Sequence, residues 1–145
     1  MDVKFKKLSS EAVTPTRGSV FSAGYDLYMA SSEPFKVAPG ETVKIKTNLA
    51  FEIPVGYVGL IFARSGIATK RGLRPSNCVG VIDSDYRGDV IVALHNDTNE
   101  NQTIEAKERI AQLIIMPYPN VSLIESDELN DTDRGDGGFG STGTK

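Results

Sequence analysis

The sequence predicts an all-β protein, a sandwich or jelly roll of short strands. Apolar residues alternate with polar ones, as at Val43, Ile45, Leu49, Phe51 and Ile53, which is the period of a half-buried strand. Turn signals rich in glycine and proline separate such runs at short intervals, and no long helical pattern interrupts them. At 145 residues the chain is long enough for one domain with a hydrophobic core.

Ten strand-like runs are expected: residues 3–8, 26–30, 33–37, 43–53, 57–63, 77–83, 89–96, 102–106, 109–115 and 121–125. The one place for a short helix is residues 66–71. Pro117 and Pro119 mark a boundary, so we expect a compact body over residues 1–119 and a tail over residues 120–145. Within the tail, residues 121–125 are a candidate strand lent to a neighbouring copy.

Composition narrows the possible functions. The formal charge is −3, which disfavours a nucleic acid or an anionic membrane as principal partner. With a single cysteine, Cys78, and a single histidine, His95, an intrachain disulfide and a structural zinc site are not expected, and both residues are read as structural. The start of the chain has no signal-peptide pattern and no run is long enough to span a membrane, so we expect a cytoplasmic protein.

The stretch RGDGGFGSTG, residues 134–143, has two readings. It is either a disordered terminus or a segment that becomes ordered over an anionic ligand. In the second reading Arg134 pairs with a phosphate, freed backbone N–H groups surround it, and Phe139 stacks on a flat group. An adhesion signal at RGD is disfavoured because nothing else in the chain looks extracellular.

Two more stretches are candidates for an anion site. In AGYDL, residues 23–27, Asp26 is either a turn-capping residue or a functional carboxylate beside a closely approached glycine. In ARSGI, residues 63–67, an arginine, a hydroxyl and a glycine at a possible helix start suit an anion, while the alternative is an ordinary helix cap by Ser65.

The stretch NCVGVIDSDYRG, residues 77–88, followed by a strand over residues 89–96, is read as a β-hairpin. Its strand edges offer backbone groups to a planar base, Tyr86 offers a flat face, and a carboxylate could act as a general base. The alternative is that Asp83 and Asp85 only shape the turn. In RIAQLII, residues 109–115, Gln112 is a polar residue in an apolar run, and it either has a specific partner or faces solvent at an edge.

Together these five stretches closely resemble the five ordered motifs of the trimeric dUTP pyrophosphatases, the dUTPases. The resemblance runs from Ala23 to Gly143. It implies a jelly-roll-like β-barrel with a flexible glycine-rich tail, assembled as a homotrimer. Each active site would draw motifs from all three chains, and the tail would close over one as a lid.

The resemblance implies hydrolysis of dUTP to dUMP and pyrophosphate. Asp83 would activate a water that attacks the α-phosphorus, and Mg²⁺ would be held by the phosphates with no direct protein ligand. Asp26 would help indirectly. The implied substrate-binding residues are Arg64, Ser65, Gly66 and Gln112 for the phosphates, Asn77, Gly80, Val81, Ile82, Tyr86 and Ile91 for the nucleoside, and Arg134, Phe139, Gly140 and Ser141 from the tail.

The chain departs from the family pattern at two places. Ala63 stands where a proline is usual, and Lys107-Glu108 replaces Gly-Asp before Arg109. We expect neither change to abolish activity, because Glu108 can still pair with an arginine. Two other functions compete with a dUTPase: a dCTP deaminase, which shares the fold, and a binding protein whose partner is controlled by the bound nucleotide.

Overall fold

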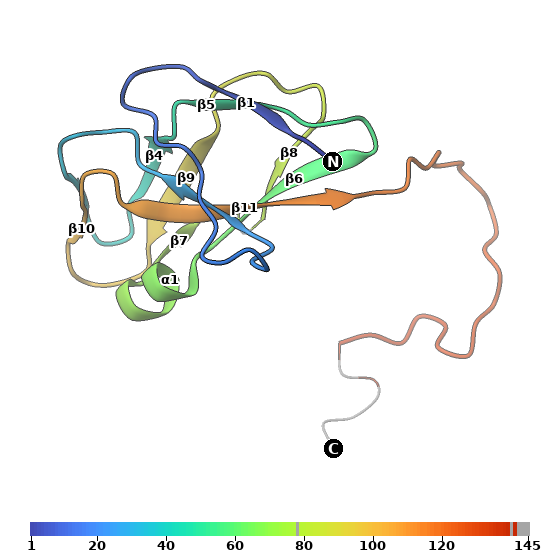
Figure 1. Ribbon diagram of the computed structural model, residues 1–145. Coiled ribbons are helices and arrows are strands. Elements are labelled where there is room, and N and C mark those ends of the chain that lie inside the picture. Colours follow the sequence, from blue (N-terminus) through green and yellow to red (C-terminus); the bar gives the residue numbers. More distant parts are fainter. Residues whose placement is uncertain (78, 140, 142–145) are drawn as a thin grey trace.

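The computed structural model describes residues 1–77, 79–139 and 141, and its regular secondary structure consists of strands and one short helix (Figure 1). The all-β prediction is therefore confirmed. The elements in chain order are β1 Lys4–Lys7, β2 Tyr25–Tyr28, β3 Phe35–Val37, β4 Thr42–Lys46, β5 Leu49–Glu52, β6 Tyr57–Phe62, α1 Ser65–Arg71, β7 Leu73–Pro75, β8 Gly80–Ile82, β9 Ile91–Asn96, β10 Gln102–Ile104 and β11 Arg109–Pro117.

In the described part of the chain the strands form four antiparallel sheets. The largest has the order β2-β11-β6-β8, and a second has the order β4-β9-β7. Two strand pairs, β1-β5 and β10-β3, complete the body. Because these sheets are hydrogen-bonded separately, the barrel of the single chain is not closed into one continuous ladder.

The core lies between the sheets and collects apolar side chains from most of the strands and from α1. Its largest fully buried members are Leu27, Leu49, Leu73, Leu94, Ile104 and Ile110. Alternating burial along β4 matches the predicted strand period, with Val43 and Ile45 buried and Thr42, Lys44 and Lys46 exposed. Among the described residues, no helix has the length and apolar character needed to cross a bilayer.

Three sequence-based expectations about elements were wrong or incomplete. The run over residues 43–53 is two strands, because Asn48 turns the chain with a φ of 51° between β4 and β5. Strand β7 was missed, since three residues ending in Pro75 carry too little periodicity. The expected hairpin is not hydrogen-bonded as one in the described residues: β8 pairs with β6, whereas β9 pairs with β4 and β7.

The short helix was predicted correctly and occupies Ser65–Arg71. It ends at Gly72, whose φ of 62° is a left-handed conformation that glycine adopts without strain. The Lys107-Glu108 departure also has a structural explanation. Lys107 has a φ of 56°, which accounts for a glycine at this position in the family pattern, and Glu108 is ion-paired with Arg71 as expected.

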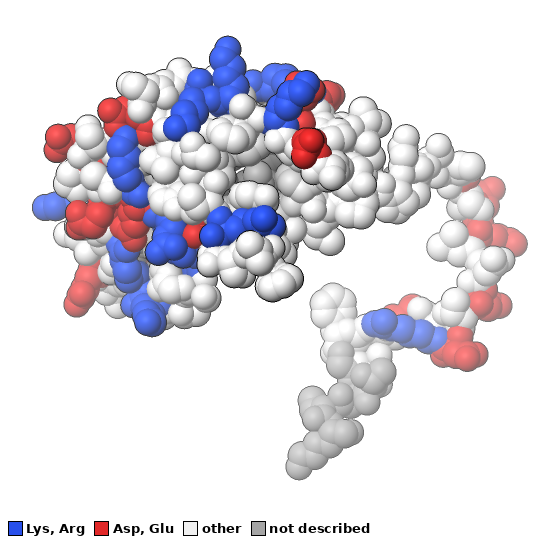
Figure 2. Space-filling model, in the orientation of Figure 1, with Lys and Arg blue, Asp and Glu red and all other residues white. Residues whose placement is uncertain are grey.

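After β11 the chain leaves the body as an extended segment (Figure 1). The described residues of the tail form no strand within the single chain, and residues 121–125 are exposed. The expected strand in a neighbouring copy therefore stays a prediction. Acidic side chains are spaced along this segment, whereas positively and negatively charged side chains are mixed on the visible face of the body (Figure 2).

Asn96 is a buried polar residue that joins three segments at the end of β9. Its Nδ2 donates to the carbonyl oxygens of Val37, Ala38 and Glu100 at 3.0, 3.1 and 2.8 Å. Its Oδ1 accepts from the N–H and the hydroxyl of Thr98 at 2.9 and 2.8 Å. The side chain therefore satisfies main-chain groups that would otherwise be buried without partners.

We expect Asn96→Ala to lower the free energy of unfolding by about 3 kcal/mol, because it leaves several buried polar groups unpaired. Chemical denaturation measures this change. Asn101→Ala is the matched control, since Asn101 is exposed, and it should change stability by less than about 0.5 kcal/mol. A loss below about 1 kcal/mol for Asn96→Ala would contradict the role given to this side chain.

Candidate active site

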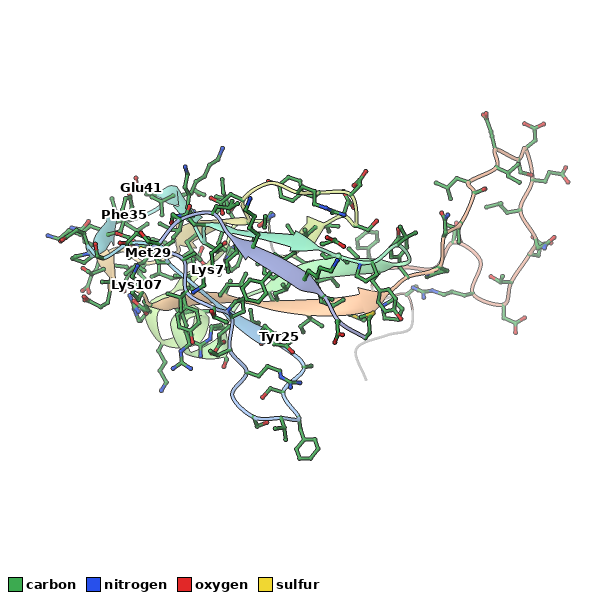
Figure 3. All side chains as sticks on the ribbon, turned by 45° about the horizontal axis from the view of Figure 1, so that its top comes forward. Lys7, Tyr25, Met29, Phe35, Glu41 and Lys107 are labelled. Atoms are coloured by element: carbon green, nitrogen blue, oxygen red, sulfur yellow. The ribbon has the colours of Figure 1, made fainter. Side chains whose placement is uncertain are left out.

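A groove of about 610 Å³ lies where the loop over residues 17–24 meets the starts of β2 and α1 and the middle of β11. We call it the Arg64 groove. Its lining residues are Gly18, Ser22, Ala23, Gly24, Asp26, Arg64, Ser65, Gly66, Arg109, Gln112 and Ile114. Figure 3 shows the loop projecting from the body, with Tyr25 where it joins β2, and the guanidinium of Arg17 lies 5.2 Å from the Tyr25 ring centre.

Asp26 is the electrostatic centre of the Arg64 groove. Its Oδ1 accepts from Arg64 Nε at 2.7 Å, and its Oδ2 accepts from an Arg109 NH group at 3.2 Å. The Asp26 side chain is only 13% exposed, so the two guanidinium groups compensate a largely buried carboxylate. Two cations against one anion leave a net positive charge beside an open groove, which suits an anionic ligand.

Gln112 has a specific partner, so the solvent-facing alternative is wrong. Its Nε2 donates to the carbonyl of Ala63 at 2.9 Å, which ties β11 to the residue before Arg64. Its Oε1 lies against Gly24, where any Cβ would be 2.4 Å from that oxygen. A side chain at position 24 would therefore displace the Gln112 amide from its present place.

Ser65 does not cap the helix. Arg64 occupies the N-cap position with an extended backbone and no side-chain cap, and Ser65 is the first helical residue. Ser65 and Gly66 are both exposed toward the groove, and a Cβ at Gly66 would meet nothing within 4 Å. Space is thus open next to the Ser65 hydroxyl, Arg64 and Gln112.

A second cavity, of about 180 Å³, lies between β8, β9 and the loop that joins them. We call it the Tyr86 pocket, and it is lined by Val81, Ile82, Asp83, Tyr86, Asp89, Val90 and Ile91. Gly80 and Asn77 are not among its lining residues, but they lie close to each other: a Cβ at Gly80 would be 3.2 Å from Asn77 Nδ2. The strands predicted to form a hairpin thus border one pocket although they belong to two sheets.

Tyr86 is held in the loop by its own hydroxyl, which donates to the main-chain carbonyl of Asp89 at 2.9 Å. The ring passes so close to Gly88 that a Cβ there would lie 2.5 Å from the Tyr86 oxygen. Asp83, by contrast, is exposed and begins the turn, with its carbonyl accepting from the Tyr86 N–H at 3.1 Å. The loop therefore presents an exposed carboxylate next to a fixed aromatic ring.

Asp89 was not predicted from the sequence. Burial raises the pKa of its carboxyl above the ordinary value of 3.8, and this is partly offset by the main-chain N–H groups of Leu49 and Asn48 and by the charge of Lys46. Within the described part of the chain, Asp89 Oδ1 is buried without a hydrogen-bond partner. A buried carboxylate oxygen of this kind costs stability when it is charged.

We expect Asp89→Asn to stabilise the protein at pH 7–8 and to make no difference below about pH 4. Because the pKa is raised on folding, the folded state binds more protons than the unfolded state, and wild-type stability falls as pH rises through the folded pKa. Asparagine does not titrate, so its advantage over aspartate develops as pH rises through that range. Thermal unfolding at several pH values measures it, and a gain that is independent of pH would contradict the assignment.

The tail residues are not brought to either cavity of their own chain. Arg134 Nε donates to the carbonyl of Gly137 at 2.8 Å within the tail. Phe139 is fully exposed with a φ of 47°, and the Ser141 N–H donates to the Gly138 carbonyl at 3.0 Å. Gly140 lies outside the described residues.

The candidate site residues therefore divide into two sets. Arg64, Ser65, Gly66 and Gln112 line the Arg64 groove with Asp26, while Val81, Ile82, Asp83, Tyr86 and Ile91 line the Tyr86 pocket. The two cavities have no lining residue in common. Among residues 1–77, 79–139 and 141, no cluster of three or more His, Cys, Asp or Glu side chains is arranged to hold a metal ion.

Comparison with known proteins covers nearly the whole chain. The dUTPase family model matches residues 10–143. A deoxyuridine 5'-triphosphate nucleotidohydrolase of Nautilia profundicola is 49% identical over 143 residues, covering 99% of each chain, and one of Hahella chejuensis is 43% identical, covering 97% of this chain and 93% of that one.

Solved structures agree with the sequence relatives. The dUTPase of Staphylococcus bacteriophage 80alpha with bound dUpNHpp superposes with a TM-score of 0.90 at 33% identity, over 99% of each chain. A mutant dUTPase from phage phi11 of S. aureus, described with a structural Mg(II) ion, has a TM-score of 0.80 at 28% identity, covering 88% of this chain and 98% of that one. With both cavities formed by the motifs of that family, the chain belongs to the dUTPase family.

Proposed function

We propose that the protein hydrolyses dUTP to dUMP and pyrophosphate, with water attacking the α-phosphorus and Asp83 acting on that water. The observation that carries the proposal is the pair of cavities: one is cationic and suits phosphates, and the other is bordered by strand edges, an aromatic ring and an exposed carboxylate. Relatives named deoxyuridine 5'-triphosphate nucleotidohydrolase and a structural neighbour with bound dUpNHpp support it.

In the Arg64 groove the ligand would be the triphosphate. Arg64, Ser65, Gly66 and Gln112 all line this groove, and a Cβ at Gly66 would meet nothing within 4 Å, so there is open space beside them. Charge-assisted hydrogen bonds from Arg64 would hold phosphate oxygens more strongly than neutral donors do. Asp26 would act indirectly, by fixing the Arg64 guanidinium at 2.7 Å.

Magnesium fits this site as part of the substrate. Both Asp26 oxygens already accept from guanidinium groups, so the groove offers cations to phosphate oxygens rather than carboxylates to a bare metal ion. Mg²⁺ held by the three phosphates would neutralise negative charge that otherwise repels the attacking oxygen. The residues of this chain would then bind and orient the Mg²⁺–dUTP complex.

The Tyr86 pocket would select the base and the sugar. Main-chain groups of Gly80, Val81 and Ile82, together with Ile91, would pair with uracil, and Asn77 would hold an ordered water beside Gly80. Cytosine exchanges a donor for an acceptor and would leave buried groups mismatched. Tyr86, fixed by its bond to Asp89, would pack under the deoxyribose and leave no room for a ribose hydroxyl.

We further propose a homotrimer in which each active site combines the Arg64 groove of one chain with the Tyr86 pocket of another. The support is that the two cavities of one chain have no lining residue in common. The tail would pair through residues 121–125 with a neighbour and close as a lid. Arg134 would reach the γ-phosphate, Phe139 would stack on uracil, and Gly140 and Ser141 would close around the ligand.

This arrangement predicts complementation between two inactive variants. Asp83→Asn damages the Tyr86 pocket and Arg64→Met damages the Arg64 groove, so either homotrimer should be nearly inactive. Random mixing during refolding should restore about a quarter of the sites, because those sites draw each wild-type half from a different chain. Activity is measured after co-refolding, with each variant refolded alone as the control. Absence of recovery in mixed trimers would contradict shared sites.

The activity itself is tested by pyrophosphate release with Mg²⁺ from dUTP, dTTP, dCTP and UTP. Rapid release from dUTP alone is the expected result. Release of ammonia from dCTP would instead identify the deaminase activity that the same fold supports. A folded protein that acts on none of the four nucleotides would overturn the proposal.

A further inference from the structure

A further groove, of about 460 Å³, lies beside β1 and β5, on a part of the body that the proposed function does not use. We call it the Lys6 groove. Its lining residues are Lys4, Phe5, Lys6, Leu8, Ala50, Phe51, Glu52 and Arg87. Three of these side chains are cationic and one is acidic, so the lining carries a net positive charge. The groove therefore suits a negatively charged partner.

The floor of the Lys6 groove is apolar. The rings of Phe5 and Phe51 are in contact, with their centres 6.2 Å apart. Phe51 is buried, whereas Phe5 and Leu8 remain 43% and 44% exposed. Large apolar side chains that are exposed together mark a place where a partner binds. A partner for this groove therefore needs an apolar side chain as well as negative charge.

The lysines of the groove are accessible to such a partner. Lys4 and Lys6 lie on β1, where all four residues are exposed. Figure 2 shows Lys and Arg side chains gathered at the top of the body, where Figure 1 places β1 and β5. Lys4 is in an ion pair with Glu52 at 3.3 Å, but both side chains are more than half exposed. An ion pair of this kind contributes little, so it competes weakly with another carboxylate.

The tail has the complementary pattern. Residues 120–133 contain five acidic side chains and no cationic one, and the acidic residues are Glu125, Asp127, Glu128, Asp131 and Asp133. Leu129 lies among these acidic residues and is 89% exposed. The segment extends away from the body of its own chain (Figure 1). It therefore offers carboxylates and an apolar side chain to the groove of another copy.

Arg87 connects the Lys6 groove with the candidate active site. It donates to the main-chain carbonyls of Ser84 and Tyr86 at 2.6 and 3.0 Å, so it belongs to the loop that forms part of the Tyr86 pocket. In the tail, Phe139 follows Asp133 by six residues, a reach of at most about 20 Å for an extended chain. An acidic segment held beside Arg87 would therefore deliver the lid close to the Tyr86 pocket.

We propose that residues 125–133 of one copy dock in the Lys6 groove of a neighbouring copy. The earlier carboxylates pair with the lysines of β1, the later ones lie toward Arg87, and Leu129 covers the apolar floor. Docking keeps the lid at a high local concentration beside the Tyr86 pocket. The kinetic consequence rests on the proposed function and its lid, whereas the docking itself is measured without activity.

Cross-linking between copies tests the contact directly. The full-length protein is refolded as a mixture of unlabelled and isotopically labelled chains and treated with a carbodiimide, which joins a carboxylate to a lysine amine in contact with it. Mass spectrometry should find Lys4 or Lys6 joined to Asp127 or Glu128 in products that combine a labelled and an unlabelled peptide. Links within single chains only, or no link at this groove, would overturn the proposal.

Charge reversal gives a kinetic test. Lys4→Glu/Lys6→Glu reverses the charge of the groove, and Asp127→Lys/Glu128→Lys reverses that of the tail. At low salt, either change should raise KM for dUTP about fivefold and leave kcat within about twofold, because the residues of both active-site cavities are unchanged. Combining the two reversals restores opposite charges and should return KM to within about twofold of wild type. The fivefold difference should shrink at high salt, which screens exposed charges.

Lys36→Glu/Lys44→Glu is the matched control. It makes the same change of charge at two exposed lysines of β3 and β4 that do not line the groove, and KM should stay within about twofold. An equal rise of KM in this control would overturn the proposal, as would a failure of the combined reversals to recover.

The proposed function and the docking surface can fail separately. A wild-type protein that forms the cross-link between copies but does not hydrolyse dUTP would overturn the proposed function and retain the docking surface. A protein that hydrolyses dUTP but forms no such link would overturn the docking surface alone. A monomeric protein would overturn both the docking and the proposed trimer.

Discussion

Asp83→Asn is expected to lower kcat for dUTP hydrolysis by about 10²- to 10⁴-fold, the range that a positioned general base contributes. The carboxylate lies at the start of the β8–β9 loop, exposed and lining the Tyr86 pocket. Asparagine has the same size and can still hold a water, but it cannot take a proton from it. Pyrophosphate release from dUTP with Mg²⁺ measures the effect.

Measuring the affinity for dUpNHpp distinguishes the loss of the general base from damage to the substrate-binding site. Because uracil recognition is assigned to the β8 main chain and phosphate recognition to the Arg64 groove, the affinity of Asp83→Asn for dUpNHpp should stay within about threefold of wild type. Asp83→Glu provides a second comparison, since it keeps a base but displaces it by one methylene. A kcat for Asp83→Asn within about tenfold of wild type would rule out Asp83 as the base.

The sequence predicted which residues line the two cavities better than it predicted which strands pair around them. Arg64, Gln112 and Asp26 come from three separate strands or loops, yet the structure brings them to one groove. Hydrophobic alternation identified most strands because burial on one face is a local signal. It did not identify strand partners, and for that reason the expected β8–β9 hairpin was wrong: pairing depends on long-range contacts that a local pattern does not contain.

Two buried polar residues did leave a signal in the sequence. Thr47 falls on the buried phase of the run that includes Val43, Ile45 and Leu49, and Asn96 follows Val92 and Leu94 at the same spacing. A polar residue in a buried register must find a partner, which is what the structure shows for both. Asp89 carried no such signal, because its segment meets the β4–β5 turn through long-range contacts such as the bond from the Val90 N–H to the Leu49 carbonyl.

The second large effect is expected for Arg64→Met, which should lower kcat/KM for dUTP by roughly 10²-fold, because hydrogen bonds to charged groups contribute about 1.5–3 kcal/mol each. Methionine retains much of the apolar length of arginine, so the start of α1 should keep its packing. Initial rates over a range of dUTP concentrations measure the loss. Lys36→Met, which removes the charge of an exposed residue of β3, is the control and should leave kcat/KM unchanged.

Arg64→Met removes both the ion pair with Asp26 and the proposed contact with a substrate phosphate. The double variant Arg64→Met/Asp26→Asn distinguishes the effects of these two losses. If the guanidinium acts mainly by neutralising Asp26, which is 13% exposed and otherwise paired only with Arg109 at 3.2 Å among the described contacts, removing both charges should recover most of kcat/KM. If Arg64 binds phosphate directly, as proposed, the double variant should remain within about threefold of Arg64→Met, because the triphosphate still lacks its cation. Recovery to near wild-type activity would therefore reassign Arg64 from substrate binding to support of Asp26.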